Sequence, residues 1–342
     1  MSIKKYYYVS GNTAEGLVNF LPSNVTGFEQ IVILKHPSEQ LKTDVLRGVI
    51  KRYEKTYDLE IMLSSISGQY LEGIIIRERS MAIIIDHVAI PDLKATVEVD
   101  LSLFLAEQKV LPIENERFHQ AYNSFSAGLR IHDKLEAIYV NEMDFAKADQ
   151  LADQFIRELL KEQPKRKKKS HVYRRLFGTN TTEGVVNIVP QLIESLSHVY
   201  HLKGRAGTGK STFMKKVLAA CTDYGFDVEL FHCSFDPHSI DMVRVPELDF
   251  CIFDSTDPHE IVPRREAEKI IDLYKETVEP GTDEKYAKEI QAIHSNYKSY
   301  MKQGIRQLKE AGEIVEKQEQ QYAYSDKERE KIIEFIMEFH VE

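Results

Sequence analysis

The sequence of 342 residues contains no tryptophan, only three cysteines and no long apolar run. Cys221, Cys233 and Cys251 are odd in number and lack paired spacing, which argues against a disulfide framework and favours a reducing compartment. No apolar run approaches the ~20 residues that span a bilayer, and residues 1–11 lack the apolar core of a signal peptide. We therefore expect a cytoplasmic protein without a membrane span.

The chain also lacks an excess of positive charge, because 54 acidic residues outnumber 45 lysines and arginines and the formal net charge is −9. This balance argues against a general nucleic-acid-binding surface. The exception is the segment 164–170 (PKRKKKS), which has no apolar residue. We interpret it as a solvated linker; the alternative is a weak, salt-sensitive contact with an anionic partner such as nucleic acid or a lipid surface.

The chain contains an internal duplication. Residues 12–22 (NTAEGLVNFLP) match residues 180–190 (NTTEGVVNIVP) at an offset of 168. Further positions continue the match, with small local slips, namely Lys42 with Lys210, Thr43 with Ser211, and Asp86 with Asp254. A period this long indicates two tandem domains and not a solenoid. With an apolar content of 42%, the chain has enough residues for two separate cores.

The richest motif lies in the second half, where residues 204–211 (GRAGTGKS) fit the pattern G-x-x-x-x-G-K-[ST] in full. Gly207 and Gly209 allow a backbone path whose N–H groups converge on phosphate oxygens, and the following helix directs its positive dipole end at the same anion. Lys210 would contact the β and γ phosphates, and Ser211 would offer its hydroxyl to Mg²⁺. The predicted nucleotide-binding residues are Gly204, Arg205, Ala206, Gly207, Thr208, Gly209, Lys210, Ser211 and Thr212.

An acidic residue complements this loop, because the apolar run 250–254 (FCIFD) ends at Asp254. In folds of this kind such a carboxylate reaches Mg²⁺ directly or through water. The alternative is an ordinary strand end capped by an aspartate. We predict Lys210 and Asp254 as catalytic residues, Ser211 and Asp254 as metal ligands, and ATP with Mg²⁺ as cofactors, since no Asn-Lys-x-Asp segment for reading guanine is present.

Polar residues also gather beyond the predicted strands, at the edge where open α/β sheets bind ligands. His232 and Asp236 follow the second strand, and His259 follows the third. We predict a role in binding a second substrate or sensing the γ phosphate. A structural role remains an alternative, and a zinc site is a weaker one because the spacing is not that of paired zinc ligands.

The first half lacks the phosphate motif. Its aligned residues 36–43 (HPSEQLKT) have none of the three glycines. Glu39 adds negative charge where phosphate would lie, and Pro37 removes a backbone donor. We predict a degenerate pseudo-domain over residues 1–163 that binds no nucleotide and has a structural or regulatory role.

The fold class follows from alternating strands and helices. In the second half we expect strands near residues 199–203, 228–233 and 250–254, in a parallel sheet covered by helices. An apolar stripe at spacings of three and four then predicts a long helix; it comprises Tyr286, Ile290, Ile293, Tyr297, Met301, Ile305 and Leu308. A helix near 326–340 is expected to close a hairpin on it. We predict tandem duplicated P-loop NTPase-like α/β domains, each followed by a helical hairpin, with a basic linker at 164–170 and the intact domain at 171–342.

The second half resembles a family of duplicated, ATPase-like P-loop proteins of Gram-positive spore-forming bacteria, whose activity is unassigned. The resemblance rests on five segments, at residues 177–179, 182–184, 202–212, 232–241 and 254–259. It implies the P-loop fold and ATP binding. Members of that family often keep phosphate loops in both halves, and this chain departs from the pattern because its first loop is degenerate.

Three functions fit these features. The favoured one is a slow ATPase that couples nucleotide state to the arrangement of the two halves. The second is a small-molecule or nucleotide kinase with the helical hairpin as a lid, and the third is a nucleotide-gated interaction module without turnover. Ser255 follows Asp254 where motor ATPases commonly have a glutamate, which argues against a motor. Beyond the nucleotide we expect a protein or small-molecule partner that the sequence does not specify.

Overall fold

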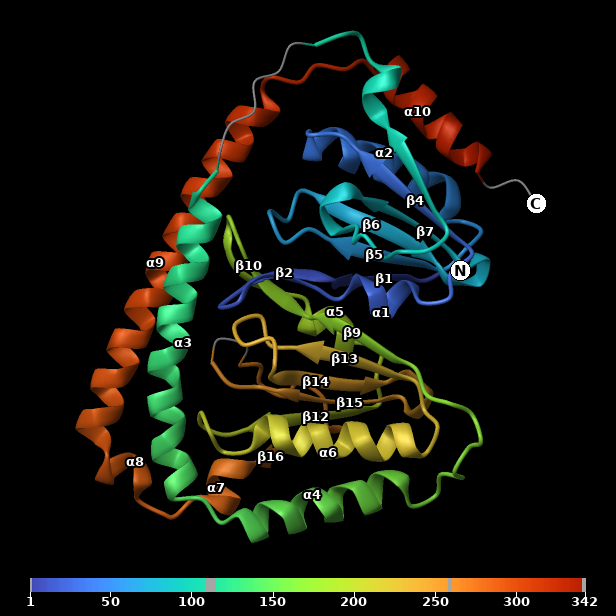
Figure 1. Ribbon diagram of the computed structural model, residues 1–342. Helices are drawn as coiled ribbons and strands as arrows, with labels where there is room; N and C mark the ends of the chain where they lie inside the picture. Colours follow the sequence, from blue (N-terminus) through green and yellow to red (C-terminus); the bar gives the residue numbers. More distant parts are fainter. Residues whose placement is uncertain (1, 109–114, 258–259, 340–342) are drawn as a thin grey trace.

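The two halves of the chain share one continuous sheet (Figure 1). A computed structural model describes residues 2–108, 115–257 and 260–339. The sheet has 12 strands in the order β16-β12-β15-β14-β13-β9-β1-β5-β6-β7-β4-β8. The order on either side of the central β9–β1 pair is the same when read outward. The duplication seen in the sequence is therefore present in the topology.

The sheet is mixed, whereas the sequence predicted a parallel one. The first half contributes β1 (Lys4–Tyr8), β4 (Gln30–Lys35), β5 (Leu59–Leu63), β6 (Leu71–Ile76), β7 (Met81–Ile85) and β8 (Thr96–Asp100). The second half contributes β9 (Val172–Leu176), β12 (His198–Lys203), β13 (Val228–His232), β14 (Ile240–Val245), β15 (Phe250–Asp254) and β16 (Glu268–Asp272). The strands β6 and β14 are antiparallel to both neighbours, and β1 is antiparallel to β9. The prediction missed β14, a short run in which two charged residues interrupt the apolar ones.

The sheet register corrects one predicted equivalence. Leu34 lies opposite Ile85 in the first half, and Leu202 lies opposite Asp254 in the second. Ile85 is therefore the counterpart of Asp254, and the match of Asp86 with Asp254 is wrong by one residue. The offset grows from 168 at β4 and β12 to 169 at β5 and β13 because the second half carries one extra residue in between.

The duplicated motif itself builds the junction between the halves. Its two copies form hairpins, β2 (Ser10–Thr13) with β3 (Gly16–Asn19) and β10 (Gly178–Thr181) with β11 (Gly184–Asn187), which join in a 4-stranded sheet. Asn12 Nδ2 donates to the carbonyl of Asn180 at 2.7 Å, and Asn180 Nδ2 donates to the carbonyl of Asn12 at 2.9 Å. The repeated segments 12–22 and 180–190 thus contact each other at the junction, so their similarity reflects this contact and not a nucleotide site.

Helices cover the sheet and connect its halves. The longer ones are α2 (Glu39–Tyr53), α3 (Arg117–Asn141), α4 (Phe145–Leu160), α6 (Lys210–Asp223), α9 (Ala287–Glu319) and α10 (Asp326–Glu338). Short helices are α1 (Leu21–Val25), α5 (Val189–Ile193), α7 (Leu273–Thr277) and α8 (Thr282–Lys285), with 3-10 turns η1 (Arg77–Arg79), η2 (Asp86–Val88), η3 (Leu101–Phe104) and η4 (Pro246–Leu248). Within the described ranges, no helix combines the length and apolar character needed to cross a bilayer.

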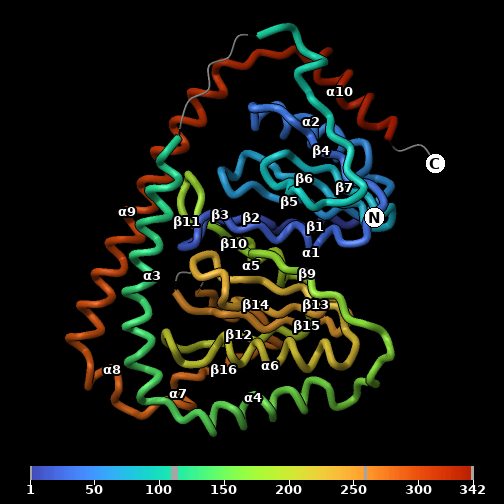
Figure 2. Tube along the Cα trace, in the orientation of Figure 1, coloured from blue at the N-terminus to red at the C-terminus, as the bar shows by residue number. Residues whose placement is uncertain are grey.

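The helices α3 and α9 run side by side along the edge of the molecule, and each carries its chain to the opposite half (Figure 2). As a result, α4 of the first half packs on α6 of the second, and α10 of the second half packs on α2 of the first. The crossing is close, because a Cβ at Gly304 would clash with the Phe125 ring. The predicted helix over the apolar stripe is confirmed, but the predicted α9–α10 hairpin is wrong: α9 pairs with α3.

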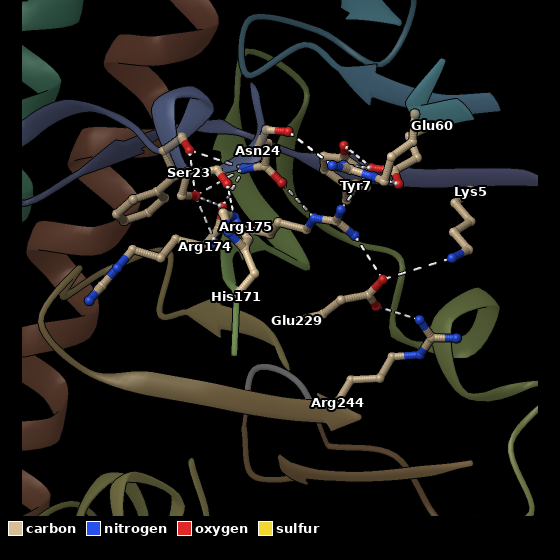
Figure 3. Close-up of polar contacts among 12 residues, drawn as sticks. Lys5, Tyr7, Ser23, Asn24, Glu60, His171, Arg174, Arg175, Glu229 and Arg244 are labelled. Atoms are coloured by element: carbon tan, nitrogen blue, oxygen red, sulfur yellow. Dashed lines mark hydrogen bonds and ion pairs between the residues drawn. The ribbon is translucent and has the colours of Figure 1, made fainter. Parts of the chain in front are cut away.

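A buried arginine lies at the centre of the junction (Figure 3). Arg175 is 2% exposed, forms ion pairs with Glu60 at 2.8 Å and Glu229 at 3.1 Å, and stacks over the Tyr7 ring at 3.7 Å. Burial alone would raise the pKa of Glu60, but the charges of Arg175 and Arg77 lower that pKa to about 2. The pair Glu60 and Glu229 occupies matching strand positions, so one arginine serves both halves.

The basic segment 164–170 is fixed to the second half by ion pairs. Lys165 contacts Asp223 at 2.7 Å, Lys168 contacts Asp227, and Arg166 contacts Glu247. The Arg166 guanidinium also lies over the Phe226 ring at 4.3 Å. Since each of these cations has an acidic partner, the segment is an ordered connection along the surface of the second half.

Candidate functional site

The glycine-rich loop joins β12 to α6, in the strand–loop–helix order that the motif requires. Gly207 and Gly209 have φ values of 74° and 79°, a region that favours glycine. Thr208 Oγ1 donates to the carbonyl of Arg205 at 2.8 Å, and a Cβ at Gly204 would clash with that threonine. The loop is therefore held in a tight path that its glycines make possible.

Lys210 and Asp254 face each other at the start of α6 and the end of β15. The Nζ–Oδ2 distance is 3.6 Å, and Nζ also donates to the carbonyl of Arg205 at 2.8 Å. Asp254 Oδ1 accepts from Thr256 Oγ1 at 2.6 Å. Ser211 Oγ accepts from the Ile240 N–H at 3.1 Å, which orients the hydroxyl toward the strand β14. The predicted catalytic and metal-binding residues thus lie together.

These residues line a cavity of about 1160 Å³ that has walls from both halves. The second half contributes the loop and the start of α6 (residues 204–213, 215 and 216), residues 233–236 and 239–241, and part of α9. The first half contributes the carboxyl end of α3 and the start of α4, including His132, Glu136 and Phe145. A cavity of this size is large enough for a nucleoside triphosphate.

The wall from α3 lies directly on the loop. A Cβ at Gly207 would lie 2.5 Å from the Glu136 carbonyl oxygen, and one at Gly209 would lie 2.9 Å from Met143 Cε. Burial and the nearby Asp133 raise the pKa of Glu136. Sequence reasoning missed these residues because they belong to the first half, and the periodicity of α3 shows an apolar face without naming its partner.

A second carboxylate, Asp241 on β14, also lines the cavity and was missed by the motif search. Burial and the charge of Asp254 raise the pKa of Asp241 to about 8. Its signal in the sequence is an acidic residue beside the apolar positions of the short run 240–245 (IDMVRV), which also carries Arg244. Two carboxylates and the Ser211 hydroxyl form a set of hard oxygen donors that fits Mg²⁺.

The metal would require further ligands from phosphate or water. Within residues 2–108, 115–257 and 260–339, no three His, Cys, Asp or Glu side chains gather in a way that could hold a metal ion. Mg²⁺ usually retains several waters and takes one or two carboxylates together with substrate phosphates. Ser211, Asp241 and Asp254 would supply one hydroxyl and two carboxylates, and two carboxylates lie within the number that Mg²⁺ usually takes.

Arg205 lines the cavity, but its side chain is engaged by neighbouring residues. Its guanidinium pairs with Asp283 at 2.8 Å and lies over the Tyr274 ring at 5.0 Å. Asp283 also accepts a hydrogen bond from Tyr139 of α3 at 2.8 Å. In this arrangement Arg205 ties the loop to α8 and, through Asp283, to α3.

The predicted sensing residues separate in the structure. Asp236 lines the cavity, where it accepts from Ser239 Oγ at 2.8 Å. His232 does not line it: the ring stacks on Phe20 at 4.5 Å, and Nδ1 contacts the carbonyl of Pro237 at 2.7 Å. Burial and the charge of Arg174 lower the pKa of His232 to about 4. His232 is therefore a packing residue, and His259 lies outside the described residues.

The corresponding region of the first half has no loop. The helix α2 begins at Glu39, so residues 39–41, which align with 207–209, are already helical. Lys42 is 2% exposed and forms ion pairs with Glu39 at 2.8 Å and Asp86 at 2.7 Å. Without the loop, no ring of backbone N–H groups surrounds an anion.

A carboxylate from the second half covers this helix start instead. Glu319, at the end of α9, accepts from Ser38 Oγ and from the Glu39 N–H, both at 2.6 Å. A negative charge at a helix N-terminus is stabilised by the helix dipole and the free N–H groups. An internal carboxylate thus occupies the anion-binding end of α2.

Comparison with family models, with curated proteins and with solved structures gives no match to this chain. The resemblance to the spore-former P-loop family therefore stays a prediction. What the structure provides is an α/β fold with a large mixed sheet flanked by helices, and a glycine-loop cavity assembled from both halves.

Proposed function

We propose that this chain is a P-loop protein that binds Mg-ATP at residues 204–211 and hydrolyses it slowly. The observation that carries the proposal is the Lys210–Asp254 pair beside the Gly207–Gly209 turn, inside a cavity of nucleotide size. Lys210 would exchange its contact with the Arg205 carbonyl for the β and γ phosphates. Ser211 and Asp254, with Asp241, would hold Mg²⁺.

The bound nucleotide would couple to the arrangement of the halves because α3 forms part of its cavity. Glu136 contacts the loop, and the α3–α9 pair extends from this cavity to the Glu319 contact in the first half. A γ phosphate that displaces α3 therefore acts on a helix shared by both halves. The kinase alternative loses support, because α9 is packed on α3 and forms no hairpin lid.

The test is a titration of Mg-ATP into the full chain and into Lys210→Ala, with phosphate release followed in parallel. Wild type should bind, and the variant should lose at least about tenfold in affinity, or ~1.4 kcal/mol. Slow release that a metabolite extract does not accelerate supports an ATPase, while absence of release supports a nucleotide-gated switch. If neither protein binds ATP, the proposed function is wrong.

A further inference from the structure

An aromatic side chain is exposed where the cavity meets the first half. Phe145, the first residue of α4, lines the cavity although it is 57% exposed. Val140 and Val185 are 39% and 45% exposed and line the same cavity. Three of the ten large apolar side chains exposed among the described residues therefore share one cavity, and exposed apolar surface that gathers in a cavity marks a ligand site.

The backbone around Phe145 is firmly held. The Asp144 N–H donates to the Thr277 carbonyl at 2.7 Å, and the Asp144 carboxylate caps α4 by accepting from the Lys147 N–H at 2.9 Å. Met143 pairs with Val278 in an isolated β-bridge. Phe145 is thus presented at a fixed place by contacts with the second half, and its exposure is not fraying of a helix end.

That place adjoins the phosphate loop. Met143 Cε lies 2.9 Å from the position of a Cβ on Gly209, and Asp149, one turn after Phe145, pairs with Lys216 of α6 at 2.6 Å. The helix α4 is therefore held across the first turns of α6. Phe145 and Met143 therefore lie beside residues 204–211 in the same cavity, next to the place where the phosphates of a nucleotide would lie.

We propose that the base of the bound nucleotide stacks on Phe145, with Val140 and Met143 completing an apolar slot. The inference rests on the proposed function and adds a division of labour: the second half binds the phosphates, and the first half binds the base. Stacking depends on the area of the π surface and tolerates different base edges. The slot therefore favours purine over pyrimidine nucleotides.

The test compares three probes, namely ATP, CTP and inorganic tripolyphosphate, each titrated with Mg²⁺ into the full-length chain. In Phe145→Ala, the Kd for ATP should rise about tenfold while the Kd for tripolyphosphate is unchanged, since stacking contributes only to base binding. Phe145→Trp should retain ATP affinity. The matched control is Phe335→Ala, which removes another exposed phenylalanine (37%) that does not line the cavity.

The outcomes separate this inference from the proposed function. Wild type that binds ATP more tightly than CTP, with the loss confined to Phe145→Ala and to nucleotides, supports the base site. If Phe145→Ala binds ATP as tightly as wild type, or loses tripolyphosphate equally, the base site is wrong while nucleotide binding stands. If wild type binds neither ATP nor tripolyphosphate, the proposed function itself has failed, and the base site falls with it.

Discussion

Glu319 and Ser38, far apart in the chain, meet at 2.6 Å where the end of α9 reaches the start of α2. In the second half the equivalent helix start is preceded by the glycine loop, and α3 lies over it. One helix start thus follows a glycine loop that lines a cavity, and the other is capped by a carboxylate from the opposite half. The duplicated halves therefore share a topology but differ at this helix start: the N–H groups of α2 donate to an internal carboxylate, whereas α6 follows a glycine loop that faces the cavity.

Glu319→Ala should destabilise the protein by about 2 kcal/mol, because hydrogen bonds to a charged acceptor contribute roughly 1.5–3 kcal/mol. Ser38 Oγ and the Glu39 N–H would lose their acceptor. Urea unfolding measures the change. Glu316→Ala removes an exposed carboxylate about one turn earlier and is expected to have little effect. Equal stability of the two variants would contradict the role of Glu319.

Arg175→Met should cost about 3–5 kcal/mol of unfolding free energy, the usual consequence of removing one partner from a buried ion pair. Glu60 and Glu229 would remain buried, with Arg77 and Arg244 as their remaining partners. The neighbouring Arg174→Met affects an exposed side chain and serves as the control in denaturant unfolding. The two variants behaving alike would show that Arg175 does not hold the halves together.

Gly207→Ala should both destabilise the fold and weaken ATP binding. A methyl group there meets the Glu136 backbone, in addition to the strain of a positive φ. Gly281→Ala is a matched control, since Gly281 has a φ of 86° with nothing within 4 Å of the added Cβ. Thermal melting should show the larger loss for Gly207→Ala. If backbone strain alone lowers the stability, the two variants should have the same melting temperature.

His232 should make the fold sensitive to mild acid. Burial lowers the pKa of His232 from 6.5 to about 4 in the folded protein, so between these values the unfolded chain binds a proton that the folded chain does not. Stability therefore falls as the pH decreases from 6.5 to 4, by about 2 kcal/mol at pH 4.5. The loss should be smaller in His232→Gln when urea unfolding is compared at pH 7 and pH 4.5. Parallel pH profiles would refute the assignment.

The sequence predicted the local features of the second half well. The glycine motif lies between β12 and α6, and the predicted strands at 199–203, 228–233 and 250–254 correspond to β12, β13 and β15. These features succeed because each depends on a short run of residues: a glycine pattern fixes a turn, and an apolar run fixes a buried strand. The apolar stripe of α9 was recognised for the same reason.

The sequence alone did not predict which helices pack against each other. Periodicity shows that a helix has an apolar face, but any apolar face of matching width satisfies it. The structure has the α3–α9 pair, whose close approach requires Gly304 because a Cβ there would clash with the Phe125 ring. Glu136 and Phe145 were missed for that reason. They join the cavity only because α3 and α4 cross to the other half.

Because each half packs a helix on the other half, the order of synthesis determines when these contacts can form. The ribosome releases α4 before α6 exists, and the apolar face of α4, including Phe155 and Leu160, packs with residues of the second half such as Phe213. At typical translation rates of ~5–20 residues per second, the helix waits roughly 3–12 s for α6 to be made. The first of the longer helices, α2, is covered by the last one made, α10. The nascent chain therefore closes its fold only when synthesis is nearly complete.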